Sequence, residues 1–190
     1  IDIKKRGARV RVLALTEIAN ESPLHTHLGQ VMSKGERLDY ALQKAVELGV
    51  SEITLLTSER CELKLRGEER ADKKLAHWQR VMIGACEQSG RNMLPLLHGP
   101  ISVADWQTQV QAEQKWVLAP AVTGGPQASA ITPTTVALLI GPEGGLSDTE
   151  IKLALQHRHT AVTLGPRILR TETAGVAALS AIQALWGDFT

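Results

Sequence analysis

Long apolar runs, aromatic residues and cysteines are all scarce in this chain of 190 residues, and each scarcity excludes a class of protein. No apolar stretch approaches the roughly 20 residues that a helix needs to cross a bilayer. The chain also lacks the basic start, apolar stretch and small-residue cleavage site of a secretory signal. The default expectations are therefore a cytoplasmic protein and no membrane partner.

The chain has only two cysteines, Cys61 and Cys86. Neither belongs to a Cys-x-x-Cys pair or a histidine cluster, so a structural zinc site is not expected. Cys86 lies on the apolar face of a predicted helix, which favours a buried free thiol over a disulfide. His25 and His27 alternate along a predicted strand, but no third ligand accompanies them, and no metal is predicted.

Charge is nearly balanced, with 21 Lys and Arg against 20 Asp and Glu. Composition alone therefore does not indicate a nucleic-acid partner. Basic residues do cluster near the start and in the middle of the chain. Such clusters fit either a solvated surface, which the charge balance favours, or contacts with a phosphate backbone. The clusters contain Lys4, Lys5, Arg6, Arg9 and Arg11, then Arg60, Lys64, Arg66, Arg70, Lys73 and Lys74.

Strand-like and helix-like segments alternate from Leu24 to the C-terminus. Two continuous apolar runs, 116–119 and 136–140, are typical of parallel strands covered on both faces. The other predicted strands are 24–32, 53–56 and 161–164. Helices are predicted to begin at Ser33, Asp72, Ser102 and Ser147, and a further helix is predicted at the C-terminus. Capping boxes are predicted for Ser33 with Glu36 and for Ser147 with Glu150. The alternation predicts an α/β fold with a mostly parallel sheet.

The start of the chain has a different pattern. Residues 9–13 alternate polar and apolar side chains with the period of a strand. Because a lone strand cannot bury its apolar face, we expect residues 1–22 to be the tail of a separate domain. Residues 21–23 are typical of a linker, and residues 23–190 form the main predicted domain.

A glycine-rich loop, Gly141–Gly145, follows the strand that ends at Ile140. Three glycines in five residues let the backbone approach a ligand closely, and ligands of open α/β sheets bind beyond the carboxyl ends of the strands. The spacing fits neither the Rossmann fingerprint nor the Walker A loop. A tight strand-to-helix turn is the structural alternative to a ligand loop.

A second unusual loop, 164–173, lies between the last strand and the last helix. Thr171 or Thr173 is predicted to cap that helix, with Glu172 in its first turn. Capping does not explain Arg167 and Arg170. An exposed arginine pair at the carboxyl edge of a sheet favours an anionic ligand.

The two loops together, as 139–147 and 164–174, resemble the paired signature of the ribosomal RNA small subunit methyltransferase E family. Four earlier segments resemble the same family in the same order. They are Leu28–Val31, Gln43–Val50, Ser58–Cys61 and Ala85–Arg91. The resemblance runs from about Glu21 to the C-terminus, and the six segments in order are far more specific than any one of them.

The resemblance implies a SPOUT-class fold, in which a mostly parallel sheet ends in a C-terminal trefoil knot, preceded by an N-terminal PUA-like β-barrel of which residues 1–22 are the remnant. It implies S-adenosylmethionine (SAM) as methyl donor without a metal, a homodimer, and N3 of a uridine in bacterial 16S rRNA of the small ribosomal subunit as acceptor. The donor-binding positions that it implies are Leu118, Ala119, Ile140, Gly141, Glu143, Gly144, Gly145, Leu164, Gly165 and Leu169.

Methylation of uracil N3 requires a base for the imide proton and a cation for the charge on the flanking carbonyl oxygens. Arg91 and Arg170 are the predicted cations, because a guanidinium fork matches a planar pair of acceptors. Glu172 is the leading base and Glu87 the alternative. In the structural alternatives, Arg91 satisfies carbonyls at a helix end and Glu172 is only a helix-start charge.

Two other functions fit parts of the pattern. A phosphotransferase would use the glycine loop for a nucleotide phosphate and would need Mg²⁺, but no acidic residue that could hold the metal ends an apolar strand. A non-catalytic RNA-binding module would bind RNA with a steep salt dependence and would not bind SAM, but the chain is only weakly basic. If the chain is a methyltransferase, we expect it to bind SAM without a metal.

Overall fold

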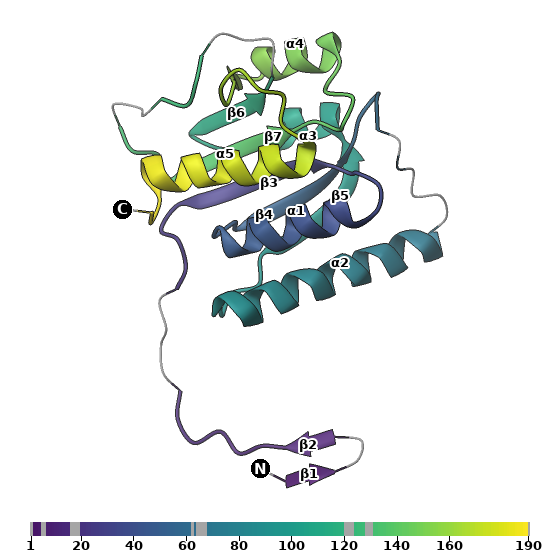
Figure 1. Ribbon diagram of the computed structural model, residues 1–190, viewed down its shortest axis with the longest axis vertical. Coiled ribbons are helices and arrows are strands. Elements are labelled where there is room, and N and C mark those ends of the chain that lie inside the picture. The colour runs from purple at the N-terminus through teal and green to yellow at the C-terminus, as the bar shows by residue number, and fades with distance from the viewer. Residues whose placement is uncertain are drawn as a thin grey trace.

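A computed structural model describes residues 2–4, 7–15, 20–61, 63, 68–119, 124–127 and 131–189. Its centre is a six-stranded sheet in the order β5-β4-β3-β7-β6-β8, in which all neighbouring strands are parallel (Figure 1). The strands are β3 (His25–Val31), β4 (Glu52–Thr57), β5 (Leu96–Ser102), β6 (Gln114–Leu118), β7 (Thr135–Ile140) and β8 (Thr160–Val162). The predicted α/β fold with a parallel sheet is confirmed.

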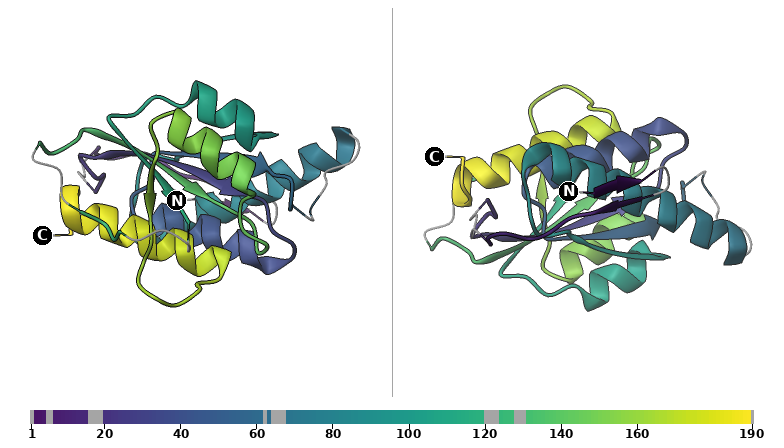
Figure 2. Two further views of the ribbon diagram at one scale, coloured as in Figure 1. Left: turned by 90° about the horizontal axis from the view of Figure 1, so that it is seen from above. Right: turned by 90° about the horizontal axis from the view of Figure 1, so that it is seen from below.

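Helices cover both faces of this sheet (Figure 2). The helices are α1 (Glu36–Glu47), α2 (Glu68–Ser89), α3 (Val103–Gln109), α4 (Asp148–Gln156) and α5 (Thr171–Trp186). On one face α1 packs against α5, and α2 packs against α1 from outside. On the other face α3 contacts α4 and lies over β3, β4 and β5. Within the described ranges, every helix is too short or too polar to span a bilayer.

The central strands are buried as their composition predicts. From Val136 to Ile140, every residue of β7 is at most 1% exposed. Each face of the sheet packs against helices, so both alternating sets of side chains enter a core. All four tryptophans are buried, including Trp78 and Trp106 at 2% exposure. The described part of the chain therefore offers no tryptophan as a surface for stacking a base.

The helix starts agree only in part with the sequence prediction. Ser147 and Glu150 form the predicted capping box of α4. The capping box predicted at Ser33 is wrong, because α1 begins at Glu36 after Gly35, whose φ is 70°, and no side chain caps it. Ser33 is instead only 3% exposed in the turn that follows β3.

Strand β5 lies at the edge of the sheet and was not predicted. Its sequence contains Gly99 and Pro100, which usually interrupt strands, but proline is tolerated in edge strands because one side makes no ladder hydrogen bonds. The helix predicted from Asp72 begins earlier, at Glu68. Cys61 and Cys86 are buried and free, as predicted for Cys86.

The N-terminal strands form a small separate sheet. Strand β1 (Asp2–Lys4) pairs only with β2 (Gly7–Arg9), in antiparallel register. The strand predicted over 9–13 is therefore wrong beyond Arg9, and residues 10–15 are exposed. The assignment of residues 1–22 to the remnant of a barrel stays a prediction.

One buried glutamine ties the last helix to the segment before β3 and to the end of α1. Gln183 is fully buried, donates to the Leu48 carbonyl at 2.8 Å and accepts a hydrogen bond from the Ser22 hydroxyl at 2.9 Å. Gly49 and Gly187 lie beside it, and a Cβ on either would come within 3 Å of its amide group. These contacts fix α5 against α1 and against the start of the sheet.

Candidate functional site

The loops after β6, β7 and β8 emerge side by side at the carboxyl edge of the sheet. Val117 pairs with Leu139, and Leu118 pairs with Val162. The Ala119 amide continues the ladder by donating to the Val162 carbonyl at 3.1 Å. The predicted donor-binding segments, at 118–119, 140–145 and 164–169, therefore start from three neighbouring strands.

The glycine loop after β7 is both a tight turn and an open stretch of backbone. A Cβ on Gly141 would lie 2.9 Å from Leu146 Cγ and 3.1 Å from the Leu146 nitrogen, so only glycine fits there. Gly145 has a φ of 70° and donates to the Pro142 carbonyl at 2.8 Å. Gly144 is exposed, and a Cβ there meets only Arg60, at 3.5 Å. The turn and the ligand-loop interpretations are thus compatible.

The loop after β4 is far from the glycine loop in sequence but contacts it through hydrogen bonds. The Arg60 guanidinium donates to the Gly144 carbonyl at 3.0 Å. The Glu59 amide donates to the Glu150 carboxylate at 3.1 Å, and the other oxygen of that carboxylate accepts from the Ser147 amide at 2.8 Å. Sequence reasoning missed these contacts. The resemblance of segment Ser58–Cys61 to the family was the only signal for them.

The start of α5 is joined to the glycine loop by a buried relay of hydrogen bonds. The Gln30 amide donates to the Thr171 hydroxyl at 3.1 Å and to the Val31 carbonyl at 3.0 Å. Because Val31 offers an acceptor, the orientation of the amide is determined. The Thr171 hydroxyl then donates to the Gly141 carbonyl at 2.7 Å. The predicted capping role of Thr171 is wrong, since Arg170 occupies the N-cap and no side chain caps α5.

Arg170 and Glu172 flank Thr171, the residue whose hydroxyl contacts the glycine loop. Arg170 is exposed, and Glu172 is half-buried in the first turn of α5. Glu172 Oε2 is buried and has no hydrogen-bond partner among the described residues. Gly165 precedes them with a φ of 81°. A buried carboxylate oxygen without a partner next to an exposed guanidinium is able to accept a proton or a hydrogen bond from a ligand.

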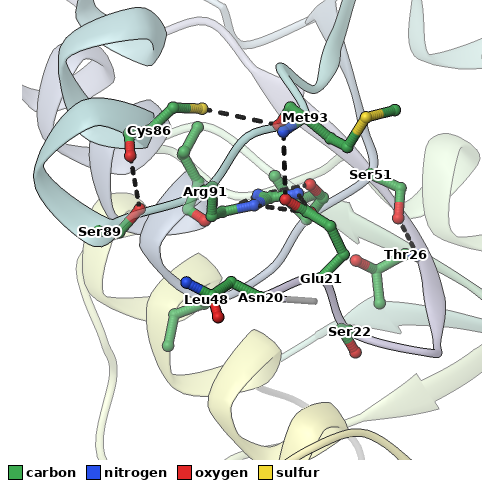
Figure 3. A network of polar contacts seen from close by, with 12 residues as sticks. Asn20, Glu21, Ser22, Thr26, Leu48, Ser51, Cys86, Ser89, Arg91 and Met93 are labelled. Atoms are coloured by element: carbon green, nitrogen blue, oxygen red, sulfur yellow. Dashed lines mark hydrogen bonds and ion pairs between the residues drawn. The ribbon is translucent and has the colours of Figure 1, made fainter. Parts of the chain in front are cut away.

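Arg91 lies at the opposite, amino edge of the sheet (Figure 3). Its guanidinium donates to the Val46 and Val50 carbonyls at 2.8 and 2.9 Å, and its Nε donates to Glu21 at 2.9 Å. The structure does not bring it to Arg170 within the chain, and its donors already have partners. As in the structural alternative, Arg91 satisfies carbonyls, but these are Val46 in α1 and Val50 before β4 rather than the end of the helix that precedes Gly90. Glu87, the alternative base, is exposed near the end of α2 that leads to Arg91.

Histidines gather around Glu52 at the same amino edge. His25 and His98 contact its carboxylate at 3.1 and 3.0 Å, and His27 lies 3.9 Å from it. Burial lowers the pKa of His27 to about 4, against the opposing effect of Glu52. No group of three or more His, Cys, Asp or Glu in the described ranges has the arrangement of a metal site.

The chain matches known proteins over most of its length. The sequence model of the RNA methyltransferase domain family matches residues 20–183. The ribosomal RNA small subunit methyltransferase E of Buchnera aphidicola (from Schizaphis graminum) is 42% identical over 171 residues, which are 90% of this chain and 69% of that protein. The chain belongs to the ribosomal RNA small subunit methyltransferase E family.

Other members of the family support the assignment. The Bacillus subtilis member is 35% identical over 194 residues, covering 95% of this chain and 73% of that protein. The Neisseria gonorrhoeae enzyme, solved with S-adenosyl methionine bound, has a TM-score of 0.83 and 43% identity over 90% of this chain and 70% of its own. A Legionella pneumophila methyltransferase, solved with bound SAM, has a TM-score of 0.88 and 45% identity over 92% of this chain and 72% of its own.

Proposed function

We propose that this protein transfers a methyl group from SAM to N3 of a uridine in the 16S rRNA of the bacterial small ribosomal subunit. The observation that carries the proposal is the identity of 45% and 43% to two structures solved with SAM, each covering at least 90% of this chain. Both alignments span far more than a single motif. The three adjacent loops at the carboxyl edge supply a site in the place where α/β sheets bind ligands.

The loops at this edge have the features that a SAM site requires. A Cβ at Gly145 would meet open space, so the backbone there is accessible to a ligand. Glu172 Oε2 offers a buried acceptor without a partner among the described residues. The residues that would hold the donor are Leu118, Ala119, Ile140, Gly141, Glu143, Gly144, Gly145, Leu164, Gly165 and Leu169. When bound, SAM supplies a methyl group on a sulfonium, which leaves without help from a metal.

Arg170 and Glu172 are the residues proposed for the acceptor side. Glu172 would take the imide proton of the uracil, because its Oε2 is a carboxylate acceptor without a partner among the described residues. Arg170 would stabilise the negative charge that then develops on the uracil oxygens. Arg170 is the N-cap of α5 and Glu172 lies in its first turn, which the Gln30–Thr171–Gly141 relay fixes in place.

The trefoil knot and the homodimer belong to the same proposal. Helix α5 follows the edge strand β8 but packs against β7 and α1 in the interior of the fold. The Thr163 amide also donates to Gly124, in the loop between β6 and β7, at 2.9 Å. Both contacts support a knotted path, in which the chain after β8 passes through the loop between β6 and β7. The homodimer rests on the resemblance to the family alone.

Calorimetric titration with SAM, without added metal and with ATP as the control, tests the donor assignment. Saturable binding of SAM and no binding of ATP are expected. Binding of ATP with Mg²⁺ and not of SAM would favour the phosphotransferase, and RNA binding without SAM binding would favour the non-catalytic module. The acceptor atom is tested by incubating rRNA with the protein and SAM, followed by mass spectrometry of the nucleosides. We expect 3-methyluridine, and a methyl group on any other atom would refute the N3 assignment.

A further inference from the structure

A cavity of about 510 Å³ lies where β3 ends and α1 begins. Its lining includes Ser33, Gly35, Arg37 and, from the glycine loop, Glu143. Strand β3 is the neighbour of β7 on the side away from β6 and β8. The cavity therefore adjoins the proposed donor site and shares Glu143 with it. Its volume is in the range of cavities that bind small ligands or a nucleotide.

The start of α1 leaves backbone donors directed toward the cavity. The N-cap is Gly35, with a φ of 70°, and this helix of 12 residues has no side-chain cap within the described part of the chain. The first amide groups of a helix have no partner within it, and together with the helix dipole they favour an anion. A Cβ on Gly35 would meet nothing within 4 Å, so the backbone is open at this point.

The Ser33 hydroxyl is a second, independent indication of a ligand. Ser33 is only 3% exposed, and it borders the cavity. No hydrogen bond to its side chain is found among the residues that the structure describes. An unpaired hydroxyl on a side chain that is otherwise enclosed is able to donate to, or accept from, a ligand in the cavity that it borders.

The formal charges around the cavity cancel, so an anion there would depend on the backbone amides and on a cation that is able to turn toward it. Lys34 and Arg37 border it, opposed by Glu36 and Glu143. Arg37 Nη1 lies 2.9 Å from Glu143 Oε1, and both side chains are more than a third exposed. An exposed pair of this kind is weak, and Arg37 is therefore able to turn to a ligand without a large loss. The guanidinium fork matches phosphate oxygens.

We propose that this cavity binds a phosphate of the RNA backbone next to the target nucleotide, through Ser33, Arg37 and the amides at the start of α1. This inference rests on the proposed function. The site lies beside the donor loops, where a nucleotide adjoining the target base must pass. Tyr40, three positions after Arg37 on α1, is 46% exposed and offers an aromatic face for an unpaired base of the same strand.

The test compares Ser33→Ala and Arg37→Gln with the wild type, and uses Arg80→Gln on the exposed part of α2 as the matched control. The probe is a fluorescein-labelled, single-stranded, uridine-containing oligoribonucleotide, followed by fluorescence anisotropy over a series of KCl concentrations. Arg37→Gln should weaken binding about tenfold and reduce the slope of log affinity against log salt by about 0.7, the value for one phosphate contact of a single strand. Arg80→Gln should change neither quantity.

Ser33→Ala separates a binding role from a structural one. Its hydroxyl has no partner among the described residues, so the variant should melt at the same or a higher temperature while RNA binding weakens about threefold. Calorimetry with SAM should give the wild-type affinity for both variants. A lower melting temperature with unchanged RNA binding would overturn the proposal.

The remaining outcomes are also decisive. Weaker SAM binding in Arg37→Gln with unchanged RNA binding would assign the anion site to the donor's carboxylate and overturn the proposal. RNA binding and salt slope unchanged in both variants, with SAM binding intact, would overturn it and leave the proposed function standing. Failure of the wild type to bind SAM would instead refute the proposed function. The comparison of the variants does not test that function.

Discussion

Arg91 and Glu21 form an ion pair at the amino edge of the sheet, in which the Arg91 side chain is only 6% exposed. The same carboxylate accepts a hydrogen bond from the Met93 amide at 3.2 Å (Figure 3). The guanidinium also satisfies the carbonyls that end α1, at Val46 and Val50. One arginine thus joins the segment before β3 to the end of α1 and the turn before β5.

Replacing Arg91 with methionine is expected to destabilise the fold by about 3 kcal/mol, because it leaves a carboxylate and two carbonyls without their partner. Urea unfolding measures this loss. The affinity of the folded variant for SAM should equal that of the wild type, since the ion pair lies at the edge opposite the proposed donor site. The matched control is Glu21→Gln, which keeps an acceptor and should cost less. A tenfold loss of SAM affinity in a stable Arg91 variant would contradict the structural role.

Replacing two glycines of the same loop with alanine should have different effects. Gly141→Ala places a Cβ 2.9 Å from Leu146 Cγ and should displace the loop, with at least a tenfold loss of SAM affinity and about 1 kcal/mol of stability. In Gly144→Ala the added Cβ meets Arg60 at 3.5 Å, an ordinary contact, so stability should be unchanged. Calorimetry and thermal unfolding of both variants check the contrast. Equal stability of the two would show that the turn is not as tight as described.

The relay from Gln30 through Thr171 to Gly141 should behave as one unit. Gln30→Leu and Thr171→Val should each lower stability by about 1–2 kcal/mol and weaken SAM binding, because each leaves a buried polar group unpaired. The double variant should lose less than the sum, with a coupling of about 1 kcal/mol. Thr171→Ser keeps the hydroxyl and serves as the control. Additive losses in the cycle would mean that the two side chains act independently.

Acid should destabilise the protein through His159. Burial first, and then Lys115, lowers the pKa of His159 from 6.5 to about 4. Between these values the unfolded chain binds a proton that the folded chain excludes, so stability is complete above pH 6.5 and falls as the pH drops toward 4. The shift corresponds to about 3 kcal/mol. Unfolding at pH 7 and pH 5 should show a smaller difference for His159→Gln than for the wild type, and an equal difference would refute this assignment.

The parallel sheet was predictable because its strands are marked by continuous apolar runs. The run 136–140 is typical of a strand covered on both faces, and it is buried throughout. Strand β5 was not predictable, because its glycine and proline are local signals against a strand and its pairing with β4 is a tertiary effect. The sequence around Ser33 is typical of a helix cap, but Ser33 is buried in the turn that follows β3.

The candidate site was predicted where its residues are local and missed where they are distant. Arg170 and Glu172 are close in sequence and flank Thr171, which contacts Gly141, and their place in the site stays a prediction. Arg91 was chosen for its guanidinium, and only the fold shows that it lies at the other edge. The contact of Arg60 with Gly144 spans 84 positions, and no spacing rule relates residues so far apart.

The packing around Gln183 constrains how the sequence of this protein is able to diverge. A Cβ on Gly187 would lie 1.6 Å from the Gln183 oxygen, and one on Gly49 would lie 2.9 Å from its nitrogen. A Cβ on Gly187 would also lie 2.9 Å from the Gln183 Cα, which every residue at 183 has, and Gly49 has a φ of 78°, which disfavours any side chain there. A smaller residue at 183 would therefore give up the bonds to Ser22 and Leu48 without making room for a side chain at either glycine. We therefore expect glycine at 49 and 187 to persist among relatives, whatever residue stands at 183.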